Sequence, residues 1–248
     1  MALASTLKST TQSASRSLDV YLLGVVDFDS ALFLQERTLY DLSERDDSNG
    51  VLIVCEHPPM ITVGREGSRS HIVCDSHELT SRQMDVRRLN RGGGCFVHAP
   101  GQLAIYPILP LDRLQIGLAD YRHLLEECLI DVCCDLKVPA YRREDEPGVF
   151  CRCGQIGHLG VAVKSWTSYH GMFLNVSPMP ELMRLAKSNR CGEKVTTLSA
   201  QRQRVTPMHT VRESVIRNLS IRLGYEKSYL YTGHPLLRRT KRKAYAHA

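Results

Sequence analysis

Residues 91–107 read RGGGCFVHAPGQLAIYP, and this stretch holds the strongest local signals in the chain. Three consecutive glycines, Gly92–Gly94, cost chain entropy and supply no side chain for packing. Such a run is useful where the backbone must approach a ligand closely, although a plain loop is the simpler alternative. The run matches neither a dinucleotide-binding G-x-G-x-x-G motif nor a P-loop. Arg91 adds a planar, positively charged guanidinium group, and the nearby His98 is a functional candidate.

Apolar patterns on both sides of this stretch predict strands and helices in mixed order. Strands are expected at 19–26, 51–55, 60–63, 86–89, 103–109, 148–152, 156–163 and 168–176. Helices are expected from Asp27 or Ser30 to about 44, at about 117–136, from Pro178 or Pro180 to about 188, and at 208–223 before Gly224. Because strands and helices do not alternate strictly, the pattern favours an α+β fold, a single domain with one mixed β-sheet flanked by helices.

The composition limits the function classes. The chain has 248 residues, nine cysteines and a net charge of +6, of which five positive charges lie within 238–243. The remaining body is close to neutral, so we expect no nucleic-acid binding, and no apolar run reaches the roughly 20 residues of a membrane span. Without a secretory signal, the thiols indicate a reducing compartment. We expect a flexible leader at 1–17, a folded domain at 18–226 and a basic tail at 227–248.

Three further clusters combine glycines with polar residues. The first is Gly154-Gln155-Ile156-Gly157-His158-Leu159-Gly160 on an expected strand, and the second is Tyr169-His170-Gly171 with Asn175 on the next strand. Small residues let a ligand or another backbone lie against a strand, and buried polar groups need partners. The third is Arg190-Cys191-Gly192, where the charged and flexible neighbours favour a reactive thiol. Eight other cysteines compete for that role.

Taken together, these clusters resemble the lipoyl(octanoyl) transferases, a branch of the biotin/lipoate protein ligase superfamily. The resemblance runs from about 19 to 224 and follows the order and spacing of many short pieces. The pieces are Glu56-His57-Pro58-Pro59, Thr62-Val63-Gly64-Arg65, Arg91-Gly92-Gly93, His98-x-Pro100-Gly101-Gln102-Leu103, Tyr106-Pro107, Gly148-Val149, Gly154-x-Ile156, Gly160-Val161, Tyr169-His170-Gly171, Asn175-Val176, Cys191-Gly192 and Val195-Thr196-x-Leu198. The domain at 18–226 is therefore expected to have the biotin/lipoate ligase catalytic-domain fold.

The resemblance implies an acyltransferase of lipoate biosynthesis. Members move an octanoyl group from acyl carrier protein to a lysine of a lipoyl domain through a thioester on a cysteine, whose position matches Cys191. Both steps pass through an oxyanion that needs fixed hydrogen-bond donors, for which backbone N–H groups of Gly92–Gly94 and Gly192 are candidates. The expected substrate-binding residues are Arg91, Gly92, Gly93, Gly94, Gly154, Ile156, Gly157, Gly160, Tyr169, Gly171, Asn175 and Gly192.

The most serious departure from the family pattern lies at a catalytic position. The family has a lysine that acts with the cysteine as a base, and here that position is Gln155, which cannot take up a proton. A general base typically contributes about 10²–10⁴-fold to a rate, so a replacement is needed. His98 and His170 are the preferred replacements, because each belongs to a matched cluster and imidazole titrates near neutrality.

Three interpretations remain open at this point. The leading one is an octanoyltransferase with Cys191 as nucleophile and a histidine in place of the usual lysine. The second is a homologue with impaired catalysis that binds acyl groups or lipoyl domains, and the third is an ATP-dependent lipoate or biotin ligase. The expected partners are octanoyl-acyl carrier protein as donor, and lipoyl domains of 2-oxoacid dehydrogenases and the glycine cleavage H protein as acceptors. We expect no metal site, no cofactor, no membrane partner, and a cytoplasmic location, or an organelle matrix if 1–17 is a transit peptide.

Overall fold

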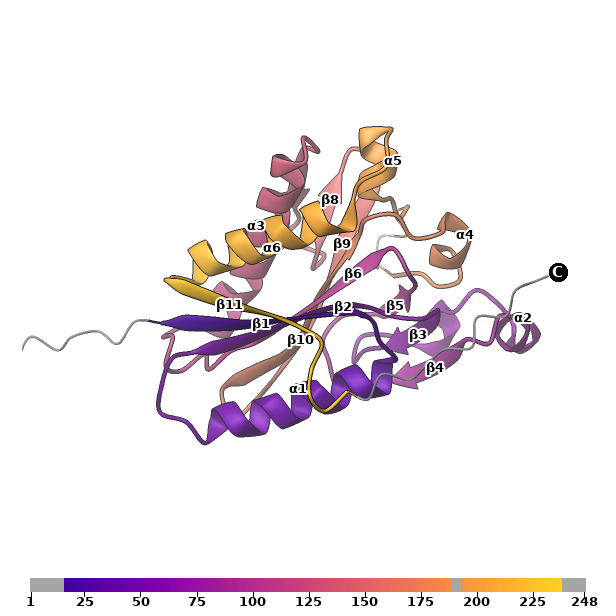
Figure 1. Ribbon diagram of the computed structural model, residues 1–248. Coiled ribbons are helices and arrows are strands. Elements are labelled where there is room, and N and C mark those ends of the chain that lie inside the picture. Colours follow the sequence, from indigo (N-terminus) through magenta and orange to yellow (C-terminus); the bar gives the residue numbers. More distant parts are fainter. Residues whose placement is uncertain (1–15, 189–191, 193, 238–248) are drawn as a thin grey trace, which may run out of the picture.

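The computed structural model describes residues 16–188, 192 and 194–237, and its core is an eight-stranded mixed sheet (Figure 1). The strand order is β11-β1-β2-β6-β10-β9-β8-β7. β1 pairs in parallel with β2 and β11, and the other neighbours are antiparallel. The strands are β1 (Ser17–Val25), β2 (Gly50–Glu56), β6 (Gln102–Ile108), β7 (Ala140–Arg142), β8 (Val149–Cys151), β9 (Gly154–Lys164), β10 (Thr167–Asn175) and β11 (Lys227–Thr232).

Helices cover both faces of this sheet, which agrees with the nearly continuous burial of its central strands β2 and β6. α3 (Leu118–Asp135) and α6 (Met208–Leu223) pack on one face, and α1 (Phe28–Ser43) packs on the other (Figure 1). Asp27 caps α1 by accepting a hydrogen bond from the Ser30 N–H, and Gly224 ends α6 in the left-handed conformation. The expectation of a single α+β domain with a mixed sheet flanked by helices is confirmed.

A small second sheet stands beside the large one. It has the order β4-β3-β5 and is formed by β3 (Met60–Val63), β4 (Asp85–Arg88) and β5 (Cys95–His98). Its apolar face packs against α4 (Pro180–Met183), so it brings the glycine-rich loop close to the chain that follows β10. The remaining short elements are η1 (Arg69–His71), α2 (Ser76–Ser81) and α5 (Leu198–Arg202).

Two sequence-based boundaries are corrected by the structure. The helix expected to run to about 188 ends at Met183, because the following chain pairs with residues 71–73 through the Lys187 N–H and the Val73 N–H. The tail expected from 227 begins with β11, whose Tyr231 ring stacks on Tyr21 at 5.0 Å. The folded domain therefore extends beyond 226, and β1 also begins one residue inside the expected leader.

Candidate active site

Arg91 is buried behind the glycine-rich loop and holds its shape. Its guanidinium donates to the carbonyl oxygens of Gly92 (2.9 Å) and Gly94 (3.2 Å), and to Thr62 O (3.0 Å) and Thr62 Oγ1 (2.6 Å). It also lies 3.9 Å from the centre of the Phe96 ring. Burial lowers its pKa to about 9, so it remains charged at neutral pH. Arg91 is completely buried, which corrects the expectation that it contacts substrate.

Several glycines that were expected to face substrate instead make room for protein atoms. A Cβ at Gly160 would lie 3.0 Å from Arg91 Cδ, and one at Gly93, where φ is +77°, would lie 2.8 Å from the Leu159 carbonyl oxygen. The Gly92 N–H donates to Val161 O at 2.8 Å, and the Gly93 N–H donates to Glu66. These N–H groups are occupied, which corrects the expectation that both are free oxyanion donors.

Three glycines on strands β9 and β10 also make room for protein atoms. A Cβ at Gly171 would overlap the carbonyl oxygen of Ile105, and one at Gly154 would overlap the carbonyl oxygen of Lys194. A Cβ at Gly157 would lie 2.9 Å from Leu129 Cδ1. Ile156, also expected at the substrate, is buried in the main core. These residues therefore fix how strands and loops pack, and they do not line the cleft described below.

His98 belongs to a buried histidine network, which we define as His57, His98, His158, Gln102 and Asn175. The His98 ring bonds Thr62 Oγ1 at 2.7 Å and Gln102 Oε1 at 2.9 Å, and the Gln102 amide donates to Asn175 Oδ1 at 2.9 Å. Asn175 Nδ2 lies 3.4 Å from His158 Nε2. Burial lowers the pKa of His98 well below its usual value and that of His158 to about 3.

His170 is also buried and away from the cleft. Its backbone has a φ of +55°, its N–H donates to Gln35 of α1, and its ring stacks on Tyr169 at 4.8 Å. Burial lowers its pKa to about 3. A general base must reach the proton that it accepts, and both rings are buried away from the cleft described below, so neither His98 nor His170 meets the expectation of a replacement base.

An open cleft with a volume of about 900 Å³ lies beside the glycine-rich loop, and most of its lining residues belong to α4 and the chain that follows it as far as Val195. Of the expected site residues, Gly94 and Gly192 line it, and Ser188 lines it as well. Cys191, the expected nucleophile, lies outside the described residues. The nearest described residues on either side of it in the chain, Ser188 and Gly192, both belong to the cleft.

Gln155 anchors the chain that leaves this cleft. Its N–H donates to Lys194 O at 2.8 Å, and its carbonyl accepts from the Thr196 N–H at 2.9 Å. Its side chain is buried, and the amide donates to Gly157 O (3.3 Å) and Pro147 O (3.4 Å). Gln155 is therefore a neutral structural residue beside the cleft.

Charged side chains at the cleft were missed by the sequence analysis. Arg184, Lys187 and Lys194 are exposed and line it, together with Glu66 and Glu146. Arg184, Lys187 and Lys194 form no ion pair with another described residue. No motif marks Lys194, because only the pairing of its backbone with Gln155 brings it beside β9.

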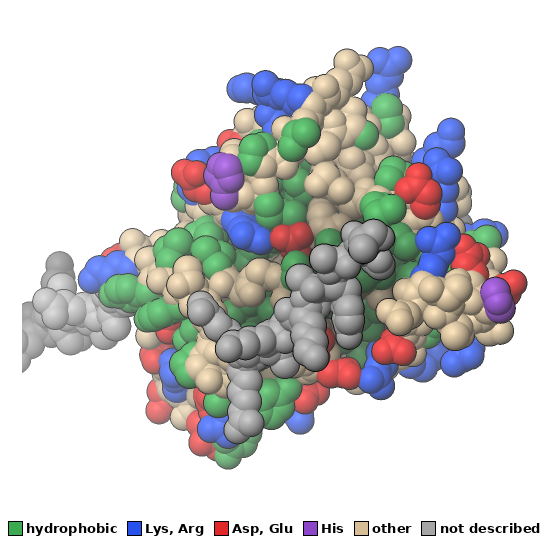
Figure 2. Space-filling view, turned by 45° about the vertical axis from the view of Figure 1, so that its right-hand side comes forward, with side chains coloured by type: hydrophobic (Ala, Val, Ile, Leu, Met, Phe, Trp, Pro, Cys, Tyr) green, Lys and Arg blue, Asp and Glu red, His purple; other side chains and the backbone are tan. Residues whose placement is uncertain are grey.

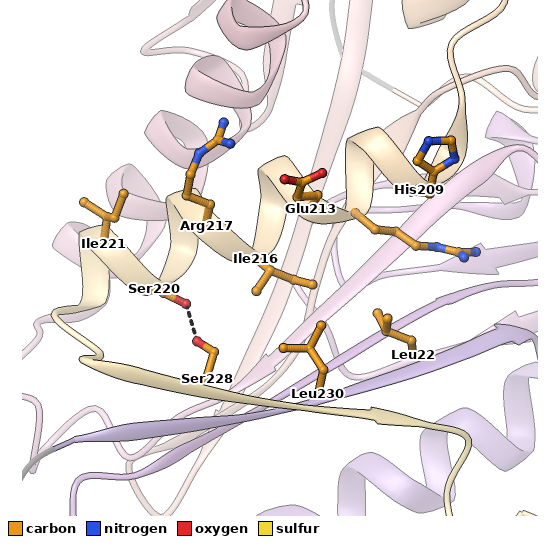
Figure 3. A pocket seen from close by; sticks show the side chains of 10 residues that line it. Leu22, His209, Glu213, Ile216, Arg217, Ser220, Ile221, Ser228 and Leu230 are labelled. Carbon is orange, nitrogen blue, oxygen red and sulfur yellow. Dashed lines mark hydrogen bonds between the residues drawn. The ribbon is translucent and has the colours of Figure 1, made fainter.

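A second hollow contrasts with this cleft. It measures about 530 Å³ and lies between α6 and strands β1 and β11, with Leu22, Ile216 and Leu230 in its wall (Figure 3). None of the expected site residues lines it. In the described part of the chain, no group of three or more His, Cys, Asp or Glu side chains is arranged to hold a metal ion, and no helix is long and apolar enough to cross a membrane.

Comparison with known proteins agrees with this architecture. Residues 29–220 match the lipoyl protein ligase A/B catalytic domain. An octanoyltransferase from Geobacter metallireducens is 34% identical over 216 residues, which cover 86% of this chain and 97% of that protein. An octanoyltransferase from Geotalea uraniireducens is 34% identical over 187 residues, which cover 74% of this chain and 83% of that protein.

Solved structures share the fold at low sequence identity. The structure of lipoate-protein ligase A bound with ATP superposes with a TM-score of 0.69 at 14% identity, over 88% of this chain and 90% of that chain. Protein Ta0514 from T. acidophilum, a putative lipoate protein ligase with bound lipoic acid, gives a TM-score of 0.68 at 13% identity, over 88% and 90%. At such identities the likeness establishes the fold alone.

Proposed function

The chain belongs to the lipoyl protein ligase A/B catalytic-domain family, and from this premise we propose that it transfers an octanoyl group from acyl carrier protein to a lysine of lipoyl domains through a thioester on Cys191. The observation that carries the proposal is the 34% identity to an octanoyltransferase over 97% of that relative's length. The open cleft supports it, because Ser188 and Gly192, on either side of Cys191 in sequence, both line a space of about 900 Å³.

The proposed reaction has two steps. The Cys191 thiolate attacks the donor thioester, the carbon–sulfur bond to the donor breaks, and the donor leaves as a thiol after taking up a proton. The amine of the acceptor lysine then attacks the enzyme thioester, loses a proton and forms an amide, while the Cys191 thiolate leaves. Splitting one acyl transfer in this way gives two easier steps.

Lys194 is the proposed proton acceptor in both steps. A base must reach the reacting atoms, and the histidines that the sequence favoured are buried with lowered pKa values. Lys194 lines the cleft and is exposed, and its backbone is held on β9 by Gln155. Two residues separate it from Cys191 in sequence, so their Cα atoms are at most about 11 Å apart in any chain conformation. A lysine side chain spans much of that distance.

The proposed partners suit the charge of the cleft. Acyl carrier protein as donor, and lipoyl domains of 2-oxoacid dehydrogenases and the glycine cleavage H protein as acceptors, are generally acidic proteins. Lys and Arg side chains lie on many parts of the face shown in Figure 2 and are interspersed with Asp and Glu side chains. Arg184 and Lys187 at the cleft supply positive charge without a described acidic partner. Complementary charge of this kind accelerates the encounter of two proteins.

Intact-protein mass spectrometry tests the proposal. After mixing with octanoyl-acyl carrier protein, the protein is expected to gain one octanoyl group, which then moves to an added lipoyl domain. Cys191→Ser is expected to gain none, and Cys134→Ser, which removes an exposed thiol on α3, is the matched control and should load like the wild type. A wild-type protein that stays unmodified, while a related octanoyltransferase is loaded under the same conditions, would contradict the proposal.

A second candidate function is supported by Gln155 alone. A neutral, buried amide at this position suits a protein that binds acyl groups or lipoyl domains without turning them over. Gln155→Lys separates the two candidates. A large gain in transfer from a near-zero starting rate would favour the binding protein, whereas an unchanged or lower rate in an already active protein favours the acyltransferase that uses Lys194.

A further inference from the structure

Two residues that line the cleft carry hydrogen-bond donors without a described acceptor. The side chain of Ser188 is buried, with 8% of the residue exposed, and its hydroxyl has no hydrogen-bond partner. Several buried side-chain polar atoms in the described part of the chain lack a partner, but among them only the Ser188 hydroxyl belongs to a residue of the cleft. Gly94 packs against the backbone of Ser188, since a Cβ built on Gly94 would be 3.6 Å from the Ser188 carbonyl oxygen.

The N–H of Gly94 is the second donor. Within the described residues it has no acceptor, whereas the N–H groups of Gly92 and Gly93 are both occupied. The peptide group that carries this N–H is fixed, because its carbonyl oxygen, that of Gly93, accepts from the Glu66 N–H at 3.2 Å. In a trans peptide the N–H points opposite to the C=O, so the Gly94 N–H points away from the Glu66 backbone.

An unpaired buried donor needs an explanation. Leaving a buried hydroxyl or amide without a partner costs about 1–3 kcal/mol, and native structures contain few such groups. The unpaired Ser188 hydroxyl is explained if a substrate atom accepts its hydrogen bond, and the partly buried Gly94 N–H can donate to the same atom. Fixed donors that wait for a developing negative charge are also the arrangement that stabilises a transition state most effectively.

We propose that the Ser188 hydroxyl and the Gly94 N–H form the oxyanion hole of the acyl transfer, donating to the carbonyl oxygen of the octanoyl group. This inference rests on the proposed function, because it concerns the same cleft and the same acyl group. The carbonyl oxygen carries the negative charge in the tetrahedral intermediate of both steps, so one pair of donors serves the loading of the enzyme and the transfer to lysine. No bond to Ser188 forms, and its proton stays on the hydroxyl.

Ser188→Ala tests the inference because a catalytic and a structural hydroxyl predict opposite effects on stability. Since the hydroxyl has no partner in the free protein, its removal is expected to leave the urea unfolding midpoint unchanged or to raise it. Loading with octanoyl-acyl carrier protein and transfer to a lipoyl domain, each measured in a single turnover at saturating substrate, are both expected to slow by about 10²-fold. Ser188→Thr, which keeps a hydroxyl, should recover most of the rate.

Ser168→Ala is the matched control for a structural hydroxyl. The Ser168 Oγ donates to Pro107 O at 2.9 Å and accepts from the Leu109 N–H at 3.1 Å, so its loss should lower the unfolding midpoint. A Ser188→Ala protein that loads and transfers at wild-type rates would overturn the inference and leave the proposed function standing. A drop in its stability like that of Ser168→Ala would also overturn it. Wild-type protein that never acquires an octanoyl group would remove the proposed function and the inference together.

Discussion

The glycine-rich loop joins two regions that contain titratable side chains in opposite surroundings. At Arg91 it is buried against Thr62, which in turn bonds His98 of the buried histidine network. At Gly94 it reaches the cleft, where Lys187 and Lys194 are exposed. In the network nearly every polar atom is bonded to protein, whereas the cations at the cleft are unpaired among the described residues.

This difference separates residues that build the site from residues that act in it. Low-dielectric surroundings suppress the charged form of His57, His98 and His158, so the network is neutral and rigid. Exposed lysines at the cleft keep contact with solvent and substrate. Motif residues such as Arg91 and His98 therefore hold the backbone in place, whereas the exposed Lys194 of the cleft belongs to no motif.

Acidification is expected to have the largest effect on the free energy of unfolding, because it favours protonation of the buried histidines. An unfolded histidine titrates near 6.5, but burial lowers the pKa of His57 to about 4 and that of His158 and His170 to about 3. Below pH 6.5 these histidines therefore bind protons in the unfolded state but not in the folded state. Their contribution to the free energy of unfolding is fully present above pH 6.5 and is lost as the pH falls toward 4. At pH 4 His158 and His170 have each lowered the free energy of unfolding by roughly 3 kcal/mol.

Urea unfolding at successive pH values measures this loss. The free energy of unfolding of a typical domain is about 5–15 kcal/mol, so protonation linked to these histidines should remove most of it before pH 4. His158→Gln removes one titrating group, so its free energy of unfolding should change less steeply between pH 6.5 and 4. A flat profile for the wild type over that range would show that the histidines are not neutral and buried.

Lys194→Gln is expected to have the largest effect at the cleft. Loss of a proton acceptor should slow acyl transfer by about 10²–10⁴-fold, while the free energy of unfolding changes by less than about 0.5 kcal/mol, because the side chain is exposed and unpaired in the described structure. Small alkylamines added to the variant should restore part of the rate. Steady-state transfer to a lipoyl domain measures both effects.

Two lysines serve as controls for this experiment. Lys164→Gln removes an exposed lysine at the far end of β9, and it should transfer like the wild type. Lys187→Gln removes the rival lysine of the cleft. A loss of rate in Lys187→Gln together with normal transfer by Lys194→Gln would show that the wrong lysine has been chosen.

Arg91→Met tests whether the buried arginine stabilises the glycine-rich loop. It removes a donor from the carbonyl oxygens of Gly92 and Thr62, while Gly94 O keeps the Gly64 N–H, and a buried acceptor left unpaired typically costs about 1–3 kcal/mol. Chemical denaturation should show this loss. Arg87→Met is the control, because its ion pair with Asp29 is exposed on both sides and should be worth less than about 1 kcal/mol.

The sequence predicted the main elements because their signals are local. The apolar run at 51–55 and the helical spacing at 117–136 correspond to β2 and α3 within two residues. β11 was missed because six residues with mostly exposed side chains form a strand only when β1 offers its edge. α4 ends early for the same kind of reason, since its continuation pairs with a segment over a hundred residues away in sequence.

The candidate site was predicted less well than the fold. Gly94 and Gly192, which were predicted to bind substrate, line the cleft, whereas Arg91 and His98 are buried. Periodicity gives the face of a strand, but it does not say whether a polar residue on that face meets solvent or another buried polar group. Ser188 and Lys194 belong to no pattern, and only the folded chain brings them to the cleft.

The smallest expected effect concerns the approach of the donor protein. Arg184 is exposed at the cleft and forms no ion pair with a described residue, so Arg184→Gln should not change stability measurably. If the donor is acidic, kcat/KM with octanoyl-acyl carrier protein should fall by about 2- to 5-fold at low salt, because a rim charge acts on the encounter rate. The difference should disappear near 0.5 M salt, where screening acts within a few ångströms.

A small octanoyl thioester in place of the carrier protein distinguishes this effect from a defect in chemistry. It carries no acidic surface, so wild type and Arg184→Gln should use it equally well at any salt concentration. Arg37→Gln, which removes an exposed arginine on α1, should match the wild type with both donors. Equal salt dependence of Arg184→Gln and wild type with the carrier protein would mean that the cleft cations act only inside the cleft, and the donor would then have to approach from another face.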